Sequence, residues 1–209
     1  MPPDVDPHEM AALGLVAVTA YEGLPLVGPP EGRRIIVTGA AGGVGSAAIG
    51  VAKAQGAFVV SIVSRTEQAE YVQLLGADET VVRPRDSTGG PLGIEEADGV
   101  LDAVGGELFG PCVGLLRPDG TPSLVGAAGG NNVRFDADQL MQGVTLTGYS
   151  SESVDGPALR RAVVALADWL RRGLLRPPAR RVLPLSDAAS AHAILERGGG
   201  RGRFLLVPP

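Results

Sequence analysis

The sequence is poor in the residues from which many active sites are built. Its 209 residues contain one cysteine, two histidines and, among 18 basic residues, a single lysine, Lys53. One cysteine, Cys112, cannot form an internal disulfide, which is consistent with a reducing cytoplasm, and we expect it to be a small apolar helix residue. His8 and His192 lie far apart in the sequence without cysteine or acidic neighbours at metal-ligand spacing. We therefore expect no zinc site made by this chain alone.

Aromatic residues and strongly charged runs are also scarce. Aromatic side chains make up 4% of the sequence, and the formal net charge is −5 without any basic run. Nucleic-acid-binding domains use basic patches and aromatic platforms, so we expect no nucleic-acid partner. We also find no signal peptide and no apolar run of membrane-spanning length, so we expect no membrane partner and a cytoplasmic location.

A glycine-rich turn between a strand and a helix is the most informative feature that is present. The apolar, β-branched run 35–37 predicts a strand that is buried on both faces. The spacing Ala40-x-Gly42-x-x-Gly45 follows, with alanine at the first position of the usual G-x-G-x-x-G pattern. Gly42 and Gly43 would let backbone approach a pyrophosphate, and Gly45 would let the next helix pack closely on the strand. This layout predicts a dinucleotide site, and the alternative is an ordinary glycine-rich turn.

The end of the second predicted strand bears on which dinucleotide binds. NAD sites place an acidic residue near this position to hold the ribose hydroxyls. Here the strand 58–63 is followed by Ser64 and Arg65, with no acid. Arg65 is suited to pair with a 2′-phosphate and Ser64 to donate a hydrogen bond to it, which favours NADPH over NADH. In the alternative interpretation, Arg65 is solvated and Ser64 forms a helix capping box with Glu67.

Strand and helix patterns alternate along most of the chain. This alternation predicts an α/β fold, a Rossmann-type doubly wound parallel sheet with helices on both faces. Besides the helix after the glycine-rich turn, the predicted helices cover residues 7–26, 66–75, 108–116, 159–172 and 186–197. The predicted strands cover residues 35–37, 58–63, 79–82, 99–104, 123–126, 144–148, 181–184 and 204–207.

The order of several short motifs resembles the medium-chain dehydrogenase/reductase superfamily, and most closely its zinc-independent quinone oxidoreductase branch. The motifs are Thr19-Ala20-Tyr21, residues 39–45, Leu75-Gly76-Ala77-Asp78, residues 101–106, residues 115–120 and the ending from Pro184 to Arg203. The resemblance implies that residues 1–209 form a dinucleotide-binding domain with a C-terminal helix–strand extension. It also implies that the N-terminal GroES-like catalytic domain of the family is absent.

The resemblance further implies a cofactor site and a reaction. The reaction would be NADPH-dependent hydride transfer to a small molecule, a quinone or a conjugated enone, without zinc. The alternative is a cofactor-domain remnant that acts as a binding module or as a non-redox enzyme. The implied cofactor-binding residues are Ala41, Gly42, Gly43, Val44 and Gly45 at the pyrophosphate, Ser64 and Arg65 at the adenosine phosphate, Val104 and Gly105 at the ribose, Thr19, Val125 and Gly126 at the nicotinamide, and Arg203 at the pyrophosphate.

Two interactions with other chains are also expected. The predicted strand 144–148 should lie at the edge of the sheet, where unpaired backbone groups invite pairing with another chain. We expect a homodimer through residues 144–150, with Val144, Leu146 and Tyr149 at the contact, unless the segment 127–143 covers this edge. A partner chain could also supply the missing catalytic domain. No catalytic residue is identified in this chain.

Overall fold

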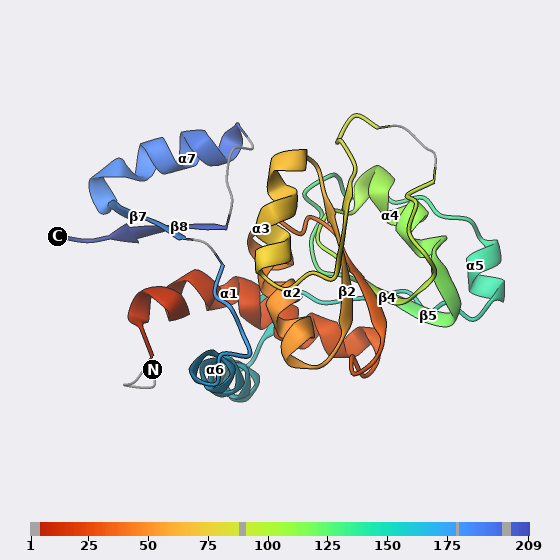
Figure 1. Cartoon of the computed structure of the whole chain (residues 1–209), viewed down its shortest axis with the longest axis horizontal. Coiled ribbons are helices and arrows are strands. Elements are labelled where there is room, and N and C mark those ends of the chain that lie inside the picture. Colours follow the sequence, from red (N-terminus) through yellow and green to blue (C-terminus); the bar gives the residue numbers. More distant parts are fainter. Residues whose placement is uncertain (1–4, 88–90, 179, 198–201) are drawn as a thin grey trace.

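The fold is built around a six-stranded parallel sheet in the order β3-β2-β1-β4-β5-β6 (Figure 1). The computed structural model describes residues 5–87, 91–178, 180–197 and 202–209. The strands are β1 (Arg34–Val37), β2 (Phe58–Val63), β3 (Glu79–Val82), β4 (Ala97–Asp102), β5 (Leu116–Leu124) and β6 (Thr147–Gly148). Every pairing in the sheet is parallel. The predicted Rossmann-type fold is confirmed.

Helices cover both faces of the sheet because alternate residues of the central strands point to opposite faces. In β1, Ile35 and Val37 belong to one apolar core and Ile36 belongs to the other. The first core holds helices α1 (Pro7–Gly23), α2 (Gly43–Ala54), α3 (Ala69–Leu74) and α6 (Gly156–Arg171). The second core holds α4 (Gly106–Val113).

The first helix begins as the sequence predicts and then breaks once. The Asp6 side chain accepts a hydrogen bond from the backbone N–H of His8, and Pro7 occupies the first turn. Gly14 has non-helical backbone angles (φ 32°, ψ −136°) and kinks α1, which continues into the 3-10 turn η1 (Leu24–Val27).

Contrary to the expectation from the sequence, the segment Pro7–Val27 is long and apolar enough to span a membrane by length and composition. Half of its most apolar window is buried inside the protein. Because its inner face belongs to the first core, against α2 and α6, packing within this domain accounts for its composition.

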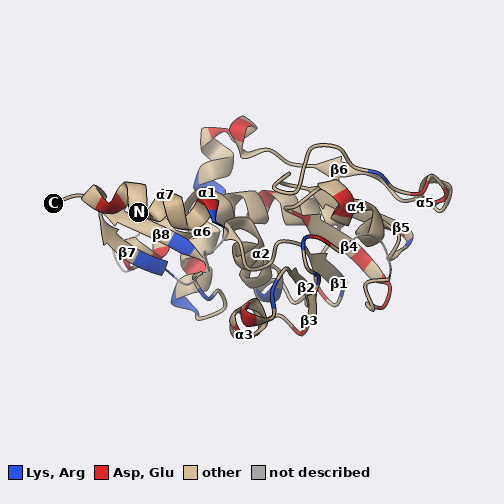
Figure 2. Cartoon of the chain, turned by 90° about the horizontal axis from the view of Figure 1, so that it is seen from above, with Lys and Arg blue, Asp and Glu red and all other residues tan. Residues whose placement is uncertain are grey.

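A small second sheet lies beside α1. It pairs β7 (Arg180–Pro184) with β8 (Arg203–Val207) in parallel and carries α7 (Ala188–Glu196) (Figure 1). In Figure 2 basic residues, coloured blue, lie on β7 near α1. Among them, Arg180 pairs with Asp6 at 3.0 Å and with Glu9 at 3.6 Å. These contacts and the packing of β8 on α1 hold the small sheet against the main domain.

Several predicted boundaries are wrong. The strand predicted over 99–104 is β4, which ends at Asp102, and the strand predicted over 123–126 is β5, which begins at Leu116 and ends at Leu124. The sequence Arg117-Pro118-Asp119-Gly120, which is typical of a turn, lies inside β5, where the pairing register with β4 shifts and Asp119 has a φ of 63°. The helices predicted over 108–116 and 159–172 each begin two or three residues earlier, as α4 and α6.

The predicted edge strand 144–148 shortens to β6, Thr147–Gly148. Val144 is buried in the second core, and its backbone N–H donates to the carbonyl of Gln139 in the unpredicted short helix α5 (Asp138–Met141). The position of β6 at the sheet edge is confirmed.

Two predicted helix starts also differ. The helix predicted over 66–75 is a 3-10 turn, η2 (Thr66–Gln68), followed by α3, and Gln68 rather than Glu67 bonds back to Ser64. Ser186 lies inside a 3-10 turn, η4 (Leu185–Asp187), and α7 begins after it.

Candidate cofactor site

The glycine-rich turn joins the carboxyl end of β1 to α2, as predicted. A Cβ atom at Gly45 would lie 2.3 Å from the carbonyl oxygen of Gly39 and 2.7 Å from the Cα atom of Ala40. Real Cβ atoms do not approach backbone so closely, so only glycine allows α2 to pack this tightly on the turn. The packing role expected of Gly45 is therefore confirmed by the geometry.

The start of α2 offers an uncapped set of backbone donors. Gly42 precedes the helix and has no side chain with which to cap it. The guanidinium of Arg203 lies directly beside this turn, since a Cβ atom at Gly43 would meet its Nη1 at 2.9 Å. The Nε atom of Arg203 is buried and has no hydrogen-bond partner among the described residues. A buried donor without an acceptor costs free energy, which an anion accepting from it would remove. The positive end of the α2 dipole also attracts negative charge, so this arrangement is suited to an anion.

A buried carboxylate shapes the opposite wall of the site. Asp102, at the end of β4, accepts a hydrogen bond from the Thr38 hydroxyl and others from the backbone N–H groups of Val104 (2.8 Å) and Gly105 (3.2 Å). Burial raises the pKa of Asp102 above its ordinary value, and these hydrogen bonds act in the opposite direction. The carboxylate thus fixes the turn that presents Val104 and Gly105.

A cleft of about 650 Å³ runs along the carboxyl ends of the strands. Such a crevice, at the edge where the strand order reverses, is where open α/β sheets bind ligands. Nine of the residues predicted to bind cofactor line it together: Ala41, Gly42, Gly43, Val44, Gly45, Ser64, Val104, Gly105 and Arg203.

The other four predicted residues do not line this cleft. Thr19 is buried in α1, and its hydroxyl donates to the carbonyl of Leu15 at 2.9 Å. Val125 packs on the first core, and Gly126 lies against the backbone of Ala103, which does line the cleft. Arg65 is exposed next to Ser64, outside the lining.

Ser64 lines the cleft, but its hydroxyl already has a partner. The side-chain oxygen Oε1 of Gln68 accepts from the Ser64 N–H at 3.1 Å, from the Ser64 hydroxyl at 3.3 Å and from the Arg65 N–H at 3.2 Å. Gln68 therefore closes the end of β2 in the way that the sequence suggested for Glu67.

Sequence reasoning missed a set of residues that the sheet brings into the cleft. Arg83, Arg85 and Ser87, which follow β3, line it beside Ser64, and Glu107, Leu108 and Pro111 of α4 line it from the other side. The signal that would have found the arginines is the strand order. Because β3 neighbours β2 in a parallel sheet, the residues after both strands lie at the same edge.

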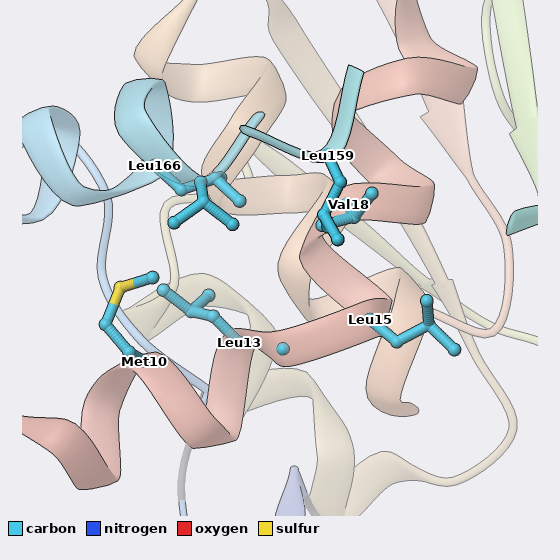
Figure 3. A pocket seen from close by; sticks show the side chains of 8 residues that line it. Met10, Leu13, Leu15, Val18, Leu159 and Leu166 are labelled. Atoms are coloured by element: carbon cyan, nitrogen blue, oxygen red, sulfur yellow. The ribbon is translucent and has the colours of Figure 1, made fainter. Parts of the chain in front are cut away.

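A second hollow, between α1 and α6, has a different character. This apolar groove, of about 250 Å³, is lined by Met10, Leu13, Gly14, Leu15, Val18, Leu159, Val163 and Leu166 (Figure 3). No polar or charged side chain lines it, so it offers no group that would orient a nucleotide.

The structure shows neither a metal cluster nor a reactive thiol in the part of the chain that it describes. No group of three or more histidine, cysteine or acidic residues there is placed to hold a metal ion. Cys112 is buried on α4, as expected, and burial raises the pKa of its thiol far above the ordinary value.

Comparison with known proteins identifies the family. The sequence matches the family described as zinc-binding dehydrogenase over residues 43–168. It is 33% identical to acrylyl-CoA reductase AcuI of Ruegeria pomeroyi, with 99% of this chain and 64% of that protein covered. The structure of YhdH from Escherichia coli K-12 with bound NADPH is 26% identical, with a TM-score of 0.82 over 99% of this chain and 65% of that one.

The structure of YhdH from Salmonella enterica in complex with NADP has the same fold, with a TM-score of 0.85 at 24% identity over 98% of this chain and 64% of that one. The chain thus spans under two thirds of the length of these relatives. The family match covers more than half of the sequence, so this chain belongs to the zinc-binding dehydrogenase family, within the medium-chain dehydrogenase/reductase superfamily.

Proposed function

We propose that this chain binds NADPH in the cleft and presents it for hydride transfer to a small conjugated carbonyl compound, a quinone or an enone. The observation that carries the proposal is the buried, unpartnered Nε of Arg203 beside the uncapped start of α2. A pyrophosphate at this point would accept from both the guanidinium and the helix amide groups.

The remaining parts of the cofactor are assigned from this anchor. Gly43, Val44 and Gly45 would face the pyrophosphate, and Val104 and Gly105, held by Asp102, would bound the ribose. Ser64 and Arg65 would face the adenosine 2′-phosphate. Every residue named here lines the cleft except Arg65 and Asp102. These two are the sequence neighbours of Ser64 and Ala103, which do line it.

The nicotinamide end is assigned by the family resemblance, to Thr19, Val125 and Gly126. Bound NADPH would supply a hydride there, and the protein's task would be to orient the ring and exclude water. Tyr21 carries a hydroxyl that could donate a proton, but its ring packs against Trp169 with ring centroids 5.7 Å apart. This packing explains Tyr21 as a core residue, and it is not assigned a role in the reaction. No proton donor to the substrate is assigned in this chain.

The substrate class is supported by the relatives. Acrylyl-CoA reductase acts, by its name, on a conjugated acyl thioester, in which a carbonyl activates the double bond in the same way as in an enone. Because the chain spans under two thirds of the length of its relatives, we propose that the domain shaping the substrate pocket lies outside residues 1–209. We also propose that zinc is not required, as the resemblance to the zinc-independent branch implies.

Titration of the 209-residue chain with NADPH tests the proposal directly. Gly43→Asp places a carboxylate at the first residue of α2, where it would repel the pyrophosphate, and we expect NADPH binding to be lost. Gly156→Asp makes the same change at the first residue of α6, in open space, and should bind NADPH like the parent. If Gly43→Asp also binds like the parent, the cleft is not the pyrophosphate site.

Activity separates the enzyme from a binding module. In the proposal, the domain that would shield the nicotinamide from water lies outside residues 1–209. We therefore expect little or no oxidation of NADPH by simple quinones and enones, measured by the absorbance of the reduced nicotinamide at about 340 nm. Robust turnover by the purified chain would show that its site is complete. If the chain binds NADPH but no turnover is found, either alone or with a partner protein added, the result would instead favour the binding-module alternative.

We also propose a homodimer through the sheet edge at residues 144–150. Support comes from the edge position of β6 and from the exposed Leu146 that directly precedes it. Val144 is buried within its own chain, so Leu146 would be the main apolar contact and Val144 would not take part.

A further inference from the structure

The segment after β3 lies against the end of β2, where a 2′-phosphate would bind. Val82 pairs with Val63 in the sheet, and the backbone N–H of Arg83 donates to the Val63 carbonyl at 2.8 Å. The chain then turns, with the Ser87 N–H donating to the Pro84 carbonyl at 3.1 Å. Arg83 and Arg85 thus reach the cleft directly beside Ser64.

The end of β2 is less able to bind a phosphate than its sequence indicates. The Ser64 hydroxyl is directed to the Gln68 side chain, so it would have to give up that bond to donate to a ligand. Arg65 is exposed and does not line the cleft, whereas Arg83 is half-buried in the cleft wall. The positive charge nearest to the adenosine end of the cleft therefore comes from the segment after β3.

The charges around this end of the cleft favour an anion. Among the residues that the structure describes, the charged ones that line the cleft are Arg83, Arg85, Arg203 and Glu107. Arg203 is at the start of α2, and Glu107 lies on the opposite wall in the first turn of α4. Asp86 and Glu67, the nearest acidic residues in the sequence, are exposed and outside the lining.

We propose that Arg85, with Arg83 and Ser87, binds the adenosine 2′-phosphate and is the main determinant of the preference for NADPH over NADH. This inference rests on the proposed function, because it assigns one end of the same cofactor. It moves the specificity from Arg65, after β2, to the neighbouring loop after β3.

The two arginines have different surroundings and therefore different expected roles. Arg83 lies close enough to α4 that its positive charge lowers the pKa of Cys112, although burial dominates and raises it. Arg83 is half-buried and lines the cleft, so it forms part of the cleft wall. Arg85 is exposed in the turn closed by the Ser87–Pro84 hydrogen bond and also lines the cleft, so its side chain is accessible to a phosphate bound there.

Binding of cofactor halves tests this assignment without requiring any catalysis. The probes are 2′,5′-ADP, which carries the 2′-phosphate, and 5′-AMP, which does not, together with NADPH and NADH, all measured by calorimetry. We expect Arg85→Ser to weaken 2′,5′-ADP and NADPH about 10- to 100-fold, the range of a charge-assisted hydrogen bond, and to change 5′-AMP and NADH less than about twofold. Arg85→Lys should retain part of the affinity.

Two further variants control for charge and for the older assignment. Arg161→Ser removes the same charge from the exposed surface of α6 and should change no affinity. Arg65→Ala should weaken NADPH less than Arg85→Ser does. Thermal unfolding of each variant shows whether it is folded, and Arg85 is exposed, so we expect the fold to be kept.

The outcomes distinguish this inference from the function on which it rests. If the parent chain binds neither NADPH nor NADH, the proposed function fails and the inference fails with it. If the parent binds NADPH but Arg85→Ser leaves the NADPH-to-NADH ratio unchanged, only the inference is overturned. An equal loss of 5′-AMP and 2′,5′-ADP would also overturn it, because the arginine would then contact the adenosine rather than its phosphate.

Discussion

Replacing Gly45 by alanine measures how closely α2 packs on the glycine-rich turn. The added Cβ would lie 2.3 Å from the Gly39 carbonyl oxygen and 2.7 Å from the Ala40 Cα, both of which are backbone atoms that cannot rotate away. Overpacking of this kind costs about 1–3 kcal/mol. The better helix propensity of alanine returns up to ~1 kcal/mol. We therefore expect a net loss of about 1–2 kcal/mol in the free energy of unfolding.

Two other glycines provide the controls, because each begins a helix. At Gly156 a Cβ would meet nothing within 4 Å, so Gly156→Ala should be neutral or slightly stabilising. At Gly43 a Cβ would meet Nη1 of Arg203 at 2.9 Å and Cγ1 of Val16 at 3.2 Å, both side-chain atoms, so Gly43→Ala should lose less stability than Gly45→Ala but weaken NADPH binding by displacing the guanidinium.

Thermal and urea unfolding decide the matter. For a chain of this size a loss of 1 kcal/mol lowers Tm by about 2–4 °C, so Gly45→Ala should melt about 2–8 °C below the parent. If Gly45→Ala is as stable as Gly156→Ala, the helix can move away from the turn at no cost. The explanation of Gly45 by close packing would then be wrong.

Three further predictions follow from single residues. Arg203→Gln should weaken NADPH binding about 10- to 100-fold without lowering stability, as measured by titration and melting, because it removes a buried donor that has no partner in the free protein. Asp102→Asn should be less stable than the parent by about 1–3 kcal/mol near pH 4, since an amide group would face backbone N–H donors. Burial raises the pKa of Asp102 in the folded chain. The stability advantage of the parent over Asp102→Asn, measured in urea titrations, should therefore shrink as the pH rises from about 3.8 through that raised pKa. A stability advantage that grows with pH would contradict this reasoning. Leu146→Glu should convert a dimer into a monomer in light scattering while Val164→Glu, on α6, should not, and a monomeric parent would refute the interface.

The local part of the site could be predicted from the sequence because it depends on neighbours in the chain. The strand, the glycines at 42, 43 and 45 and the following helix form one continuous segment, and its geometry is set by sterics within that segment. Thr19 shows the limit of such reasoning. A threonine in a helix can bond to the carbonyl four residues earlier, and here it does so with Leu15, which no motif reveals.

The errors at the far edge of the sheet have a common physical cause. Residues 117–120 carry strong turn signals and form a bulge, but Leu116 and Thr121 on either side of it both pair with β4, so the strand continues across them. Val144 lies in an alternating apolar pattern typical of a strand, yet its side chain is buried in the second core, which also holds α4. In both places a tertiary contact overrides a local preference.

The adenosine end of the cleft was hidden for a related reason. Arg83 and Arg85 follow a strand that resembles any other, and only its pairing with β2 brings them beside Ser64. Arg203 reaches the same cleft from the small sheet, which is fixed to α1 by β8 and by the pairing of Arg180 with Asp6. The pyrophosphate is thus recognised by a local motif that is shared across the fold, whereas the charges that would select one cofactor come from loops joined only by strand order. Specificity in this chain should therefore change with substitutions after β3 even when every residue of the glycine-rich turn is kept.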